Sequence, residues 1–268
     1  MINVEILTIG NEILLGLVED TNSNYLCRVV RGMGGRVRQI SVVRDEIEAI
    51  ADNISASIDR GAALIFTCGG LGPTDDDLTL TAIAKSAGLE LEVNEEAKQL
   101  VQSRYQRLAL QGYVSSAEMS DARLKMARLP EGARPVENPV GAAPAVVLEH
   151  RGARIVSLPG VPAELKGIVE GPLQTLLTEV FGRGSYRERQ MTVECGDESE
   201  LAPALRKVVS AHPEAYIKSR ASRFGSDVKF RILISVSGAS AEETEHMIES
   251  TSTDLTAALN DAGIKRQR

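Results

Sequence analysis

The hydrophobic positions of the first 90 residues follow two alternating periods. Short apolar runs with β-branched residues, such as Val4–Ile9 and Leu64–Cys68, indicate buried strands. Between such runs, as in residues 26–33, apolar side chains recur at the three- and four-residue spacing of one helix face. Because this alternation is typical of a parallel sheet covered by helices, we expect an α/β domain. The expected elements are strands at 4–9, 37–43 and 64–68, and helices at about 21–33, 47–58 and 76–88.

The middle of the chain departs from this simple alternation. Residues 94–127 have a helical pattern with a break around Gly112, and this excursion suits either a lid or a dimer surface. Two apolar runs, 145–148 and 155–158, flank a turn-like segment and predict a hairpin, which would add antiparallel strands to the sheet. Pro162 suits the first turn of a helix that we expect to continue to about residue 180.

The segment Phe181–Ser185 contains two glycines and is the best candidate linker. It predicts a larger domain over residues 1–182 and a small domain over 185–268. The second part has the pattern strand, helix, strand, strand, helix, which fits a small α+β sandwich. The expected elements there are strands at 190–194, 215–218 and 228–236, and helices at 199–210 and 241–259.

Composition narrows the function classes. The chain of 268 residues has a net charge of −7 and a pI near 5.2, so broad binding to nucleic acid is disfavoured. A basic group around Lys218, Arg220, Arg223, Lys229 and Arg231 fits either a solvated face or contact with a substrate phosphate. We expect a cytoplasmic protein, because no leader precedes the first strand and no apolar run has the length of a membrane span. The three well-separated cysteines suggest buried thiols in a reducing compartment.

The most informative segment is the loop Gly69–Thr79, which follows a buried strand and precedes a helix. Gly69, Gly70 and Gly72 allow a sharp turn and close approach of a ligand, and such a loop offers backbone N–H groups to a phosphate. Asp75–Asp77 could simply favour the helix dipole. Three acids exceed what a helix start needs, and together with the hydroxyl groups of Thr74 and Thr79 they favour metal binding or proton transfer.

Three further segments could contribute to the same site, and each also has a plain structural interpretation as a loop or a helix cap. They are Gly10–Glu12 with Asp20–Asn22, the rigid loop Asn138–Pro144, and the segment Leu158–Glu164, which ends a strand and begins a helix. Because ligands of such sheets bind outside the carboxyl ends of the strands, we expect the four segments to converge on one edge. The substrate-binding candidates are Gly10, Asn11, Asp20, Asn22, Gly69, Gly70, Gly72, Thr74, Thr79, Asn138, Gly141, Pro159, Gly160 and Glu164.

Taken together, these motifs resemble the amino-terminal region of the competence/damage-inducible protein A (CinA) family. That region belongs to the molybdopterin-binding superfamily of the MoaB, MogA and MoeA type. The resemblance implies a three-layer α/β domain with a mostly parallel mixed sheet, followed by a small KH-like α+β domain. It also implies a homodimer or higher homo-oligomer. Longer relatives carry an amidase domain, and because the sequence ends at residue 268 we do not expect amidase activity.

The resemblance also suggests chemistry for the acidic loop. Relatives of this region are linked to cleavage of ADP-ribose or FAD pyrophosphates with a divalent metal (Mg²⁺, Mn²⁺ or Co²⁺), assisted in some by K⁺. We therefore expect a nucleotide pyrophosphatase in which Asp76, Asp77 and Glu12 are the catalytic and metal-binding residues. One alternative is a protein that binds or adenylylates molybdopterin, so the expected partner is a nucleotide or a pterin phosphate. A second alternative is a non-catalytic nucleotide-binding module.

Overall fold

The computed structural model describes residues 2–182, 184–195, 197–221 and 229–266. The chain forms two compact units. The larger consists of Ile2–Val30 and Arg36–Val180. The smaller contains Arg31–Gly35 and the described part of Phe181–Arg268. No helix among the described residues is both long and apolar enough to span a membrane.

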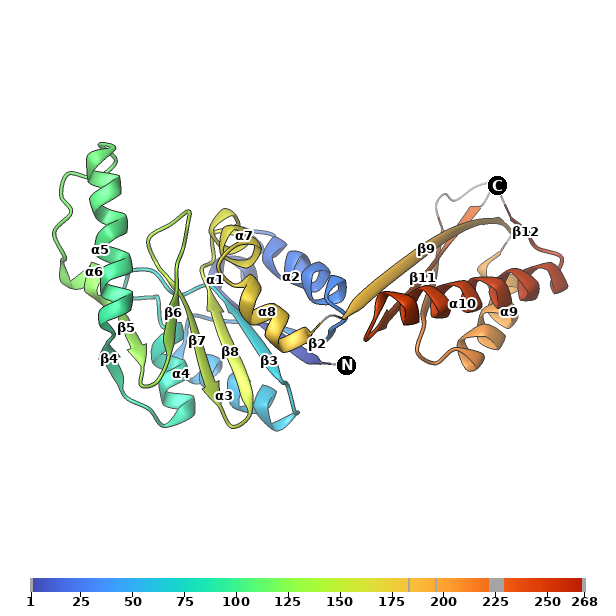
Figure 1. The fold of residues 1–268 in the computed structure, drawn as a ribbon, viewed down its shortest axis with the longest axis horizontal. Helices are drawn as coiled ribbons and strands as arrows, with labels where there is room; N and C mark the ends of the chain where they lie inside the picture. The colour runs from blue at the N-terminus through green and yellow to red at the C-terminus, as the bar shows by residue number, and fades with distance from the viewer. Residues whose placement is uncertain (1, 183, 196, 222–228, 267–268) are drawn as a thin grey trace. The chain divides into compact units, whose positions relative to one another are not determined.

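The larger unit is built on a six-stranded sheet (Figure 1). The strand order is β2-β1-β3-β8-β7-β6. The first four are parallel to one another, β7 runs antiparallel to β8, and β6 runs antiparallel to β7. The predicted mostly parallel, mixed sheet is therefore confirmed. The bounds are β1 Asn3–Ile9, β2 Arg36–Val43, β3 Leu64–Cys68, β6 Arg134–Val136, β7 Ala145–His150 and β8 Ala153–Leu158.

Helices cover both faces of this sheet, which makes the unit a three-layer structure. Side chains alternate along a strand, so Leu7 and Ile9 pack with α3 and α4 on one face. On the other face, the Thr8 hydroxyl group lies 2.9 Å from the hydroxyl of Ser23 in α2. Figure 1 shows α2, α7 and α8 grouped together. The helix bounds are α1 Asn11–Leu14, α2 Thr21–Gly32, α3 Ile47–Asp59, α4 Thr79–Ala87, α7 Pro162–Glu170 and α8 Gln174–Phe181.

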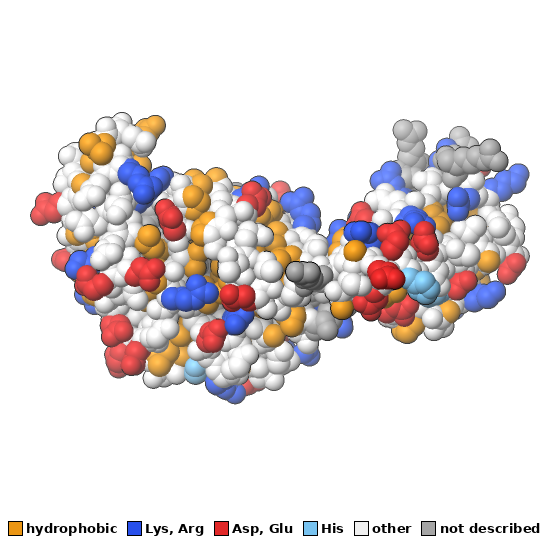
Figure 2. Space-filling model, viewed as in Figure 1, with side chains coloured by type: hydrophobic (Ala, Val, Ile, Leu, Met, Phe, Trp, Pro, Cys, Tyr) orange, Lys and Arg blue, Asp and Glu red, His pale blue; other side chains and the backbone are white. Residues whose placement is uncertain are grey.

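An excursion between α4 and β6 contains α5 (Glu95–Leu110) and α6 (Asp121–Lys125). The predicted break near Gly112 is confirmed, because α5 ends at Leu110. Leu110 and Tyr113 are 89% and 76% exposed, and Figure 2 shows hydrophobic side chains at this end of α5. Two short strands that the sequence did not predict, β4 (Leu91–Val93) and β5 (Arg128–Pro130), pair at the base of the excursion.

The structure corrects two predicted helices. The single helix expected from Pro162 to about residue 180 is divided into α7 and α8, because Gly171 leaves the helical conformation and Pro172 cannot donate a backbone hydrogen bond. The helix expected to begin at Asp76 or Asp77 begins at Thr79. The aspartates therefore precede the first turn of α4, and none of them caps it through a side-chain hydrogen bond. The predicted hairpin around residues 150–153 is confirmed.

The smaller unit has the predicted α+β order. Its four-stranded antiparallel sheet has the order β10-β11-β9-β12 and carries α9 and α10. The short strand β12 was not predicted. Arg223, from the predicted basic group, and Val228, the first residue of the predicted strand 228–236, lie outside the described residues. The bounds are β9 Ser185–Glu194, α9 Glu198–Ala211, β10 Tyr216–Ala221, β11 Lys229–Gly238, α10 Ala241–Asp261 and β12 Lys265–Arg266.

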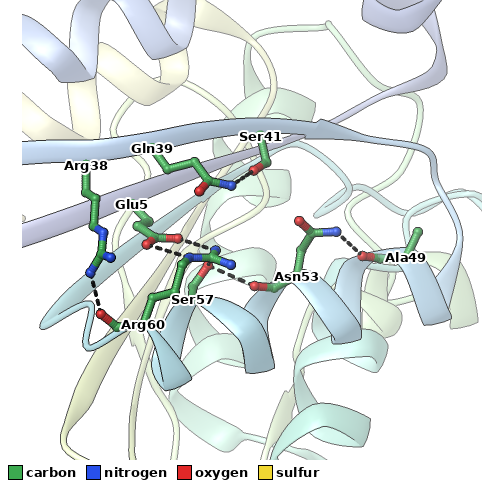
Figure 3. Close-up of polar contacts among 8 residues, drawn as sticks. All are labelled: Glu5, Arg38, Gln39, Ser41, Ala49, Asn53, Ser57 and Arg60. Carbon is green, nitrogen blue, oxygen red and sulfur yellow. Dashed lines mark hydrogen bonds and ion pairs between the residues drawn. The ribbon is translucent and has the colours of Figure 1, made fainter.

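The larger unit contains a partly buried ion pair, and cysteines occur in both units. The carboxylate of Glu5, in the middle of the sheet, accepts two hydrogen bonds from Arg60 at the end of α3 (Figure 3). The three cysteines, all within the described residues, form no disulfide. Cys68 and Cys195 are buried, whereas Cys27 is only partly buried, so the prediction of three buried thiols is wrong for that residue.

Candidate functional site

A cleft of about 610 Å³ lies at the carboxyl edge of the parallel strands. The segments that follow β1, β2, β3 and β8 all contribute to it, together with the β6–β7 connection and residues from the α5–α6 excursion. This is the edge at which ligands bind in open α/β sheets. The lining residues are Ile9, Gly10, Glu12, Asp45, Gly69–Pro73, Asp76, Asp77, Tyr105, Met126, Ala142, Ala143, Pro159–Pro162 and Glu164.

The glycine-rich loop crosses the top of β1 so closely that it leaves no room for a side chain. Gly69 has a φ of +107°, and a Cβ built on it would lie 2.3 Å from the carbonyl oxygen of Ile9. Gly70 has a φ of +68°, and its Cβ would lie 2.3 Å from the hydroxyl oxygen of Thr79. Among the backbone hydrogen bonds of the described residues, Gly70, Leu71 and Gly72 donate to no protein acceptor. Their N–H groups can therefore bind a ligand.

Thr74 organises the acidic part of this loop. Its hydroxyl group lies 2.5 Å from a carboxylate oxygen of Asp76 and 2.6 Å from one of Asp77, and its backbone N–H donates to Asp77. The hydrogen bond from Thr74, the loop backbone and the positive charge of Lys125 hold the pKa of Asp76 below its ordinary value. Asp76 is therefore an ionised acceptor at neutral pH and is poorly suited to donate a proton.

Thr79 closes the loop from its far end. Its hydroxyl group donates to the carbonyl oxygen of Gly69 at 2.8 Å, and its backbone N–H donates to the carbonyl oxygen of Gly70. Thr79 is fully buried, so it contributes to the shape of the site without lining the cleft.

The loop after β1 contributes Gly10 and Glu12 to the cleft. The carboxylate of Glu12 lies over Gly10, where a Cβ would be 2.5 Å from one of its oxygens. The backbone N–H of Asn11 donates to Asp45, at 2.8 Å, which fixes the segment after β2 beside the segment after β1. The side-chain oxygen of Asn11 is buried and has no partner among the described residues.

Asp20 and Asn22 lie outside the lining of the cleft. Asp20 caps α2 by accepting from the N–H of Ser23, and it also accepts from the hydroxyl of Thr8, so the structural interpretation of this residue is sufficient. Asn22 donates to the carbonyl oxygen of Gly160 at 2.7 Å. The other side-chain atom of Asn22, its Oδ1, is buried without a partner among the described residues. A buried amide oxygen without a donor is costly unless a ligand supplies one.

Asn138 holds the third predicted segment in place. Its Oδ1 accepts from the backbone of Val140 and Gly141, and its Nδ2 donates to Ala143 and to the carboxylate of Glu164. Asn138 is buried, with 7% of its surface exposed, so these bonds have no solvent replacement. Gly141 lies so close to Glu164 that a Cβ would be 2.0 Å from its carboxylate.

We expect Asn138→Ala to lower the free energy of unfolding by about 2 to 3 kcal/mol, because it leaves several buried partners unsatisfied. Urea unfolding followed by circular dichroism would measure the change. Asn53→Ala is the matched control, since Asn53 makes one side-chain hydrogen bond, to the carbonyl oxygen of Ala49 in its own helix. Equal effects of the two substitutions would contradict the proposed role of Asn138.

The structure brings together the predicted residues Gly10, Glu12, Gly69, Gly70, Gly72, Asp76, Asp77, Pro159, Gly160 and Glu164 as lining of the cleft. It places Asn11, Asp20, Asn22, Thr74, Thr79, Asn138 and Gly141 outside the lining. The sequence analysis missed Asp45, although this residue follows a predicted strand at the same edge and could have been found by that rule. Tyr105 and Met126 were missed because no motif places the excursion over the cleft.

The charged side chains that line the cleft are all acidic, although Lys125 lies close enough to act on Asp76. Its described lining contains five carboxylates, those of Glu12, Asp45, Asp76, Asp77 and Glu164, and no Lys or Arg. No group of three or more His, Cys, Asp or Glu side chains among the described residues is placed to share a metal ion. Glu12 therefore does not join Asp76 and Asp77 in one ligand set in this structure. A pair of carboxylates still fits Mg²⁺, which commonly completes its coordination with water and phosphate oxygens.

The fold and the site define a three-layer α/β protein with a ligand-sized cleft at the carboxyl edge of its sheet. The chain belongs to the family of probable molybdopterin binding domains, whose family model matches residues 5–179. A protein from Caldivirga maquilingensis is 41% identical over 246 residues, which are 91% of each chain. Protein TK1472 from Thermococcus kodakarensis is 35% identical over 254 residues, covering 95% of this chain and 99% of that protein.

Among solved structures, the chain is similar to the protein CinA with unknown function from Thermoplasma acidophilum. The two share 32% sequence identity with a TM-score of 0.59, and the match covers 65% of this chain and 98% of that one. The predicted resemblance to the CinA family and to the molybdopterin-binding superfamily is therefore confirmed.

Proposed function

We propose that the cleft binds a phosphorylated ligand with a flat ring, and that a divalent cation bound with it neutralises the charge of the phosphate. The observation that supports this is the charge of the lining, which has five carboxylates and no basic side chain among its described residues. A phosphate placed there without a cation would be repelled by like charges. A bound divalent cation supplies neutralisation of phosphate charge and, where hydrolysis occurs, activation of water.

The chain's own groups have separate roles in this proposal. Asp76 and Asp77, aligned by the Thr74 hydroxyl group, hold the cation. The N–H groups of Gly70, Leu71 and Gly72 donate to phosphate oxygens. The apolar lining from Tyr105, Met126 and Ala143 provides surface against which a flat ring can pack.

The first candidate ligand is a molybdopterin-type pterin phosphate. The family description supports it, since it names molybdopterin as the ligand of such domains. Pterin amino and ring N–H groups are donors, and the carboxylates that line the cleft are acceptors for them. In this candidate the chain binds the pterin or presents its phosphate for adenylylation.

The second candidate is hydrolysis of a nucleotide diphosphate such as ADP-ribose or FAD. Glu12 favours it, because its carboxylate lines the cleft outside the Asp76–Asp77 pair and can accept the proton of an attacking water. For ADP-ribose, water adds to one phosphorus, the P–O bond of the anhydride breaks, and the products are AMP and ribose 5-phosphate. K⁺ is a further candidate activator.

A ligand panel would test both candidates. Molybdopterin, ADP-ribose and FAD are titrated by calorimetry with Mg²⁺, Mn²⁺, Co²⁺ or EDTA, and products are identified by chromatography. We expect binding with a divalent ion and at least a tenfold loss of affinity in EDTA or in Asp76→Asn/Asp77→Asn. Release of AMP would select the second candidate, and binding of molybdopterin without hydrolysis would select the first.

Asp52→Asn is the matched control, because Asp52 is an exposed carboxylate of α3 that does not line the cleft. This variant should bind as the wild-type protein does. Metal-independent binding of every ligand, or equal losses in Asp52→Asn and the double variant, would overturn the metal-dependent proposal.

A further inference from the structure

A second, smaller pocket adjoins the acidic cleft. It has a volume of about 250 Å³, enough for a phosphate group with several waters of about 30 Å³ each. It is lined by Leu100, Ser103, Arg104, Arg107, Glu137, Asn138, Gly141, Ala142 and Pro144. Ala142 lines both cavities, so the loop held by Asn138 is common to them.

The charges of this pocket contrast with those of the cleft. Two arginines of α5, Arg104 and Arg107, line it together with Ser103. Glu137 is the one carboxylate of its described lining. In the described part of the chain, neither arginine has a carboxylate within the 4.0 Å that defines an ion pair. Both positive charges are therefore available to an anion.

Arg104 is held in position and is incompletely paired. One of its terminal nitrogens donates to the carbonyl oxygen of Val140, in the shared loop. Its Nε is buried and has no partner among the described residues. A buried donor of a charged group without an acceptor is costly, and a phosphate oxygen is a strong acceptor for the guanidinium fork.

We propose that this pocket is an anion subsite, in which Arg104 and Arg107 bind a phosphate group of the ligand without a metal ion. The inference rests on the proposed function in that the ligand of the cleft is phosphorylated. It assigns two anionic groups of the ligand to neighbouring cavities. One phosphate binds in the acidic cleft with a cation, and a second anionic group binds to the arginines. Ligands with two phosphate groups would then be favoured over those with one.

Inorganic phosphate in EDTA is the first probe, because it reports on the arginine pocket alone. We expect wild-type protein to bind phosphate, and Arg107→Gln and Arg104→Gln to weaken binding about tenfold each. Asp76→Asn/Asp77→Asn should bind phosphate at least as well as the wild type does. Phosphate should also compete with ADP-ribose measured in Mg²⁺, which distinguishes a subsite for the ligand from a site for free phosphate only.

Arg107→Gln is the decisive variant, since the Arg107 side chain makes no hydrogen bond or ion pair with the described residues, whereas Arg104 also supports the loop. Lys98→Gln, another cation of α5, is the control and should bind phosphate normally. Unchanged binding in a folded Arg107→Gln variant, an equal loss in Lys98→Gln, or no phosphate binding by wild-type protein would each overturn the inference. Phosphate binding without nucleotide or pterin binding would instead overturn the proposed function alone.

Discussion

Gly69→Ala is expected to destabilise the protein by more than 3 kcal/mol and to abolish ligand binding in the cleft. Its φ of +107° is unfavourable for any residue with a Cβ, which costs about 1 to 3 kcal/mol. The new methyl group would also lie 2.3 Å from the carbonyl oxygen of Ile9, which is backbone and cannot rotate away. The loop must therefore move off β1, and the hydrogen bond from Gly69 to Leu158 in β8 would be strained. Urea unfolding and calorimetric titration would measure the two effects.

Gly61→Ala is the matched control, because it introduces backbone strain without a steric clash of the new methyl group. Gly61 also has a positive φ, +80°, but a Cβ there would meet nothing within 4 Å. We expect it to cost about 1 kcal/mol and to leave binding unchanged. If the two variants were equally stable, the close contact between the glycine loop and β1 would not be a real constraint on the fold.

The same contact explains why the edge of the sheet could be predicted from the sequence. The apolar runs of β1 and β3 have the strand period, and the glycines mark where the chain must turn beside another backbone. Parallel strands end at one edge, so the segments after them were expected to meet there. These rules depend on local sequence alone, and they identified most of the cleft's polar lining.

What the sequence did not predict depends on contacts between distant segments. The Asp77 carboxylate accepts from the backbone N–H of Thr74, and the Thr79 hydroxyl donates to the carbonyl oxygen of Gly69, so helix α4 begins only at Thr79. The spacing of apolar residues cannot reveal these contacts. Strands β4 and β5 have three residues each, too few to show a period of two. The pairing of Arg104 with the shared loop likewise joins positions 36 residues apart.

Arg60→Met is expected to destabilise the protein by about 3 kcal/mol at pH 7. Arg60 donates to both carboxylate oxygens of Glu5, at 3.0 and 2.5 Å, and the Glu5 side chain is only 3% exposed (Figure 3). Without Arg60 the buried carboxylate has lost its charged partner. The carboxylate can instead be protonated at pH 7, which requires its pKa to rise by about 2.5 from its ordinary value of 4.5. Each unit of that rise costs about 1.36 kcal/mol. Protonation therefore limits the loss to about 3 kcal/mol.

Arg151→Met is the matched control for the loss of an ion pair. Arg151 pairs with Asp59 at 2.8 Å, but their side chains are 56% and 62% exposed. Solvent screens such a pair, so we expect a change of no more than about 0.5 kcal/mol. Glu5→Met/Arg60→Met should recover much of the stability lost in Arg60→Met, because it removes both charges together.

The dependence of stability on pH gives the sharpest test of this pair. In the wild-type protein, burial alone would raise the pKa of Glu5, but the hydrogen bonds from Arg60 and Ser57 outweigh it and leave the pKa below 4.5. This contribution is present above pH 4.5 and is lost as the pH falls through the lower, folded-state pKa. In Arg60→Met, burial is opposed only by Ser57 and Arg38, so we expect the folded-state pKa of Glu5 to rise above its wild-type value. Its deficit should therefore shrink as the pH falls from 7 to 5. A deficit that stays constant over this range would mean that Arg60 stabilises the fold by packing and not by its charge.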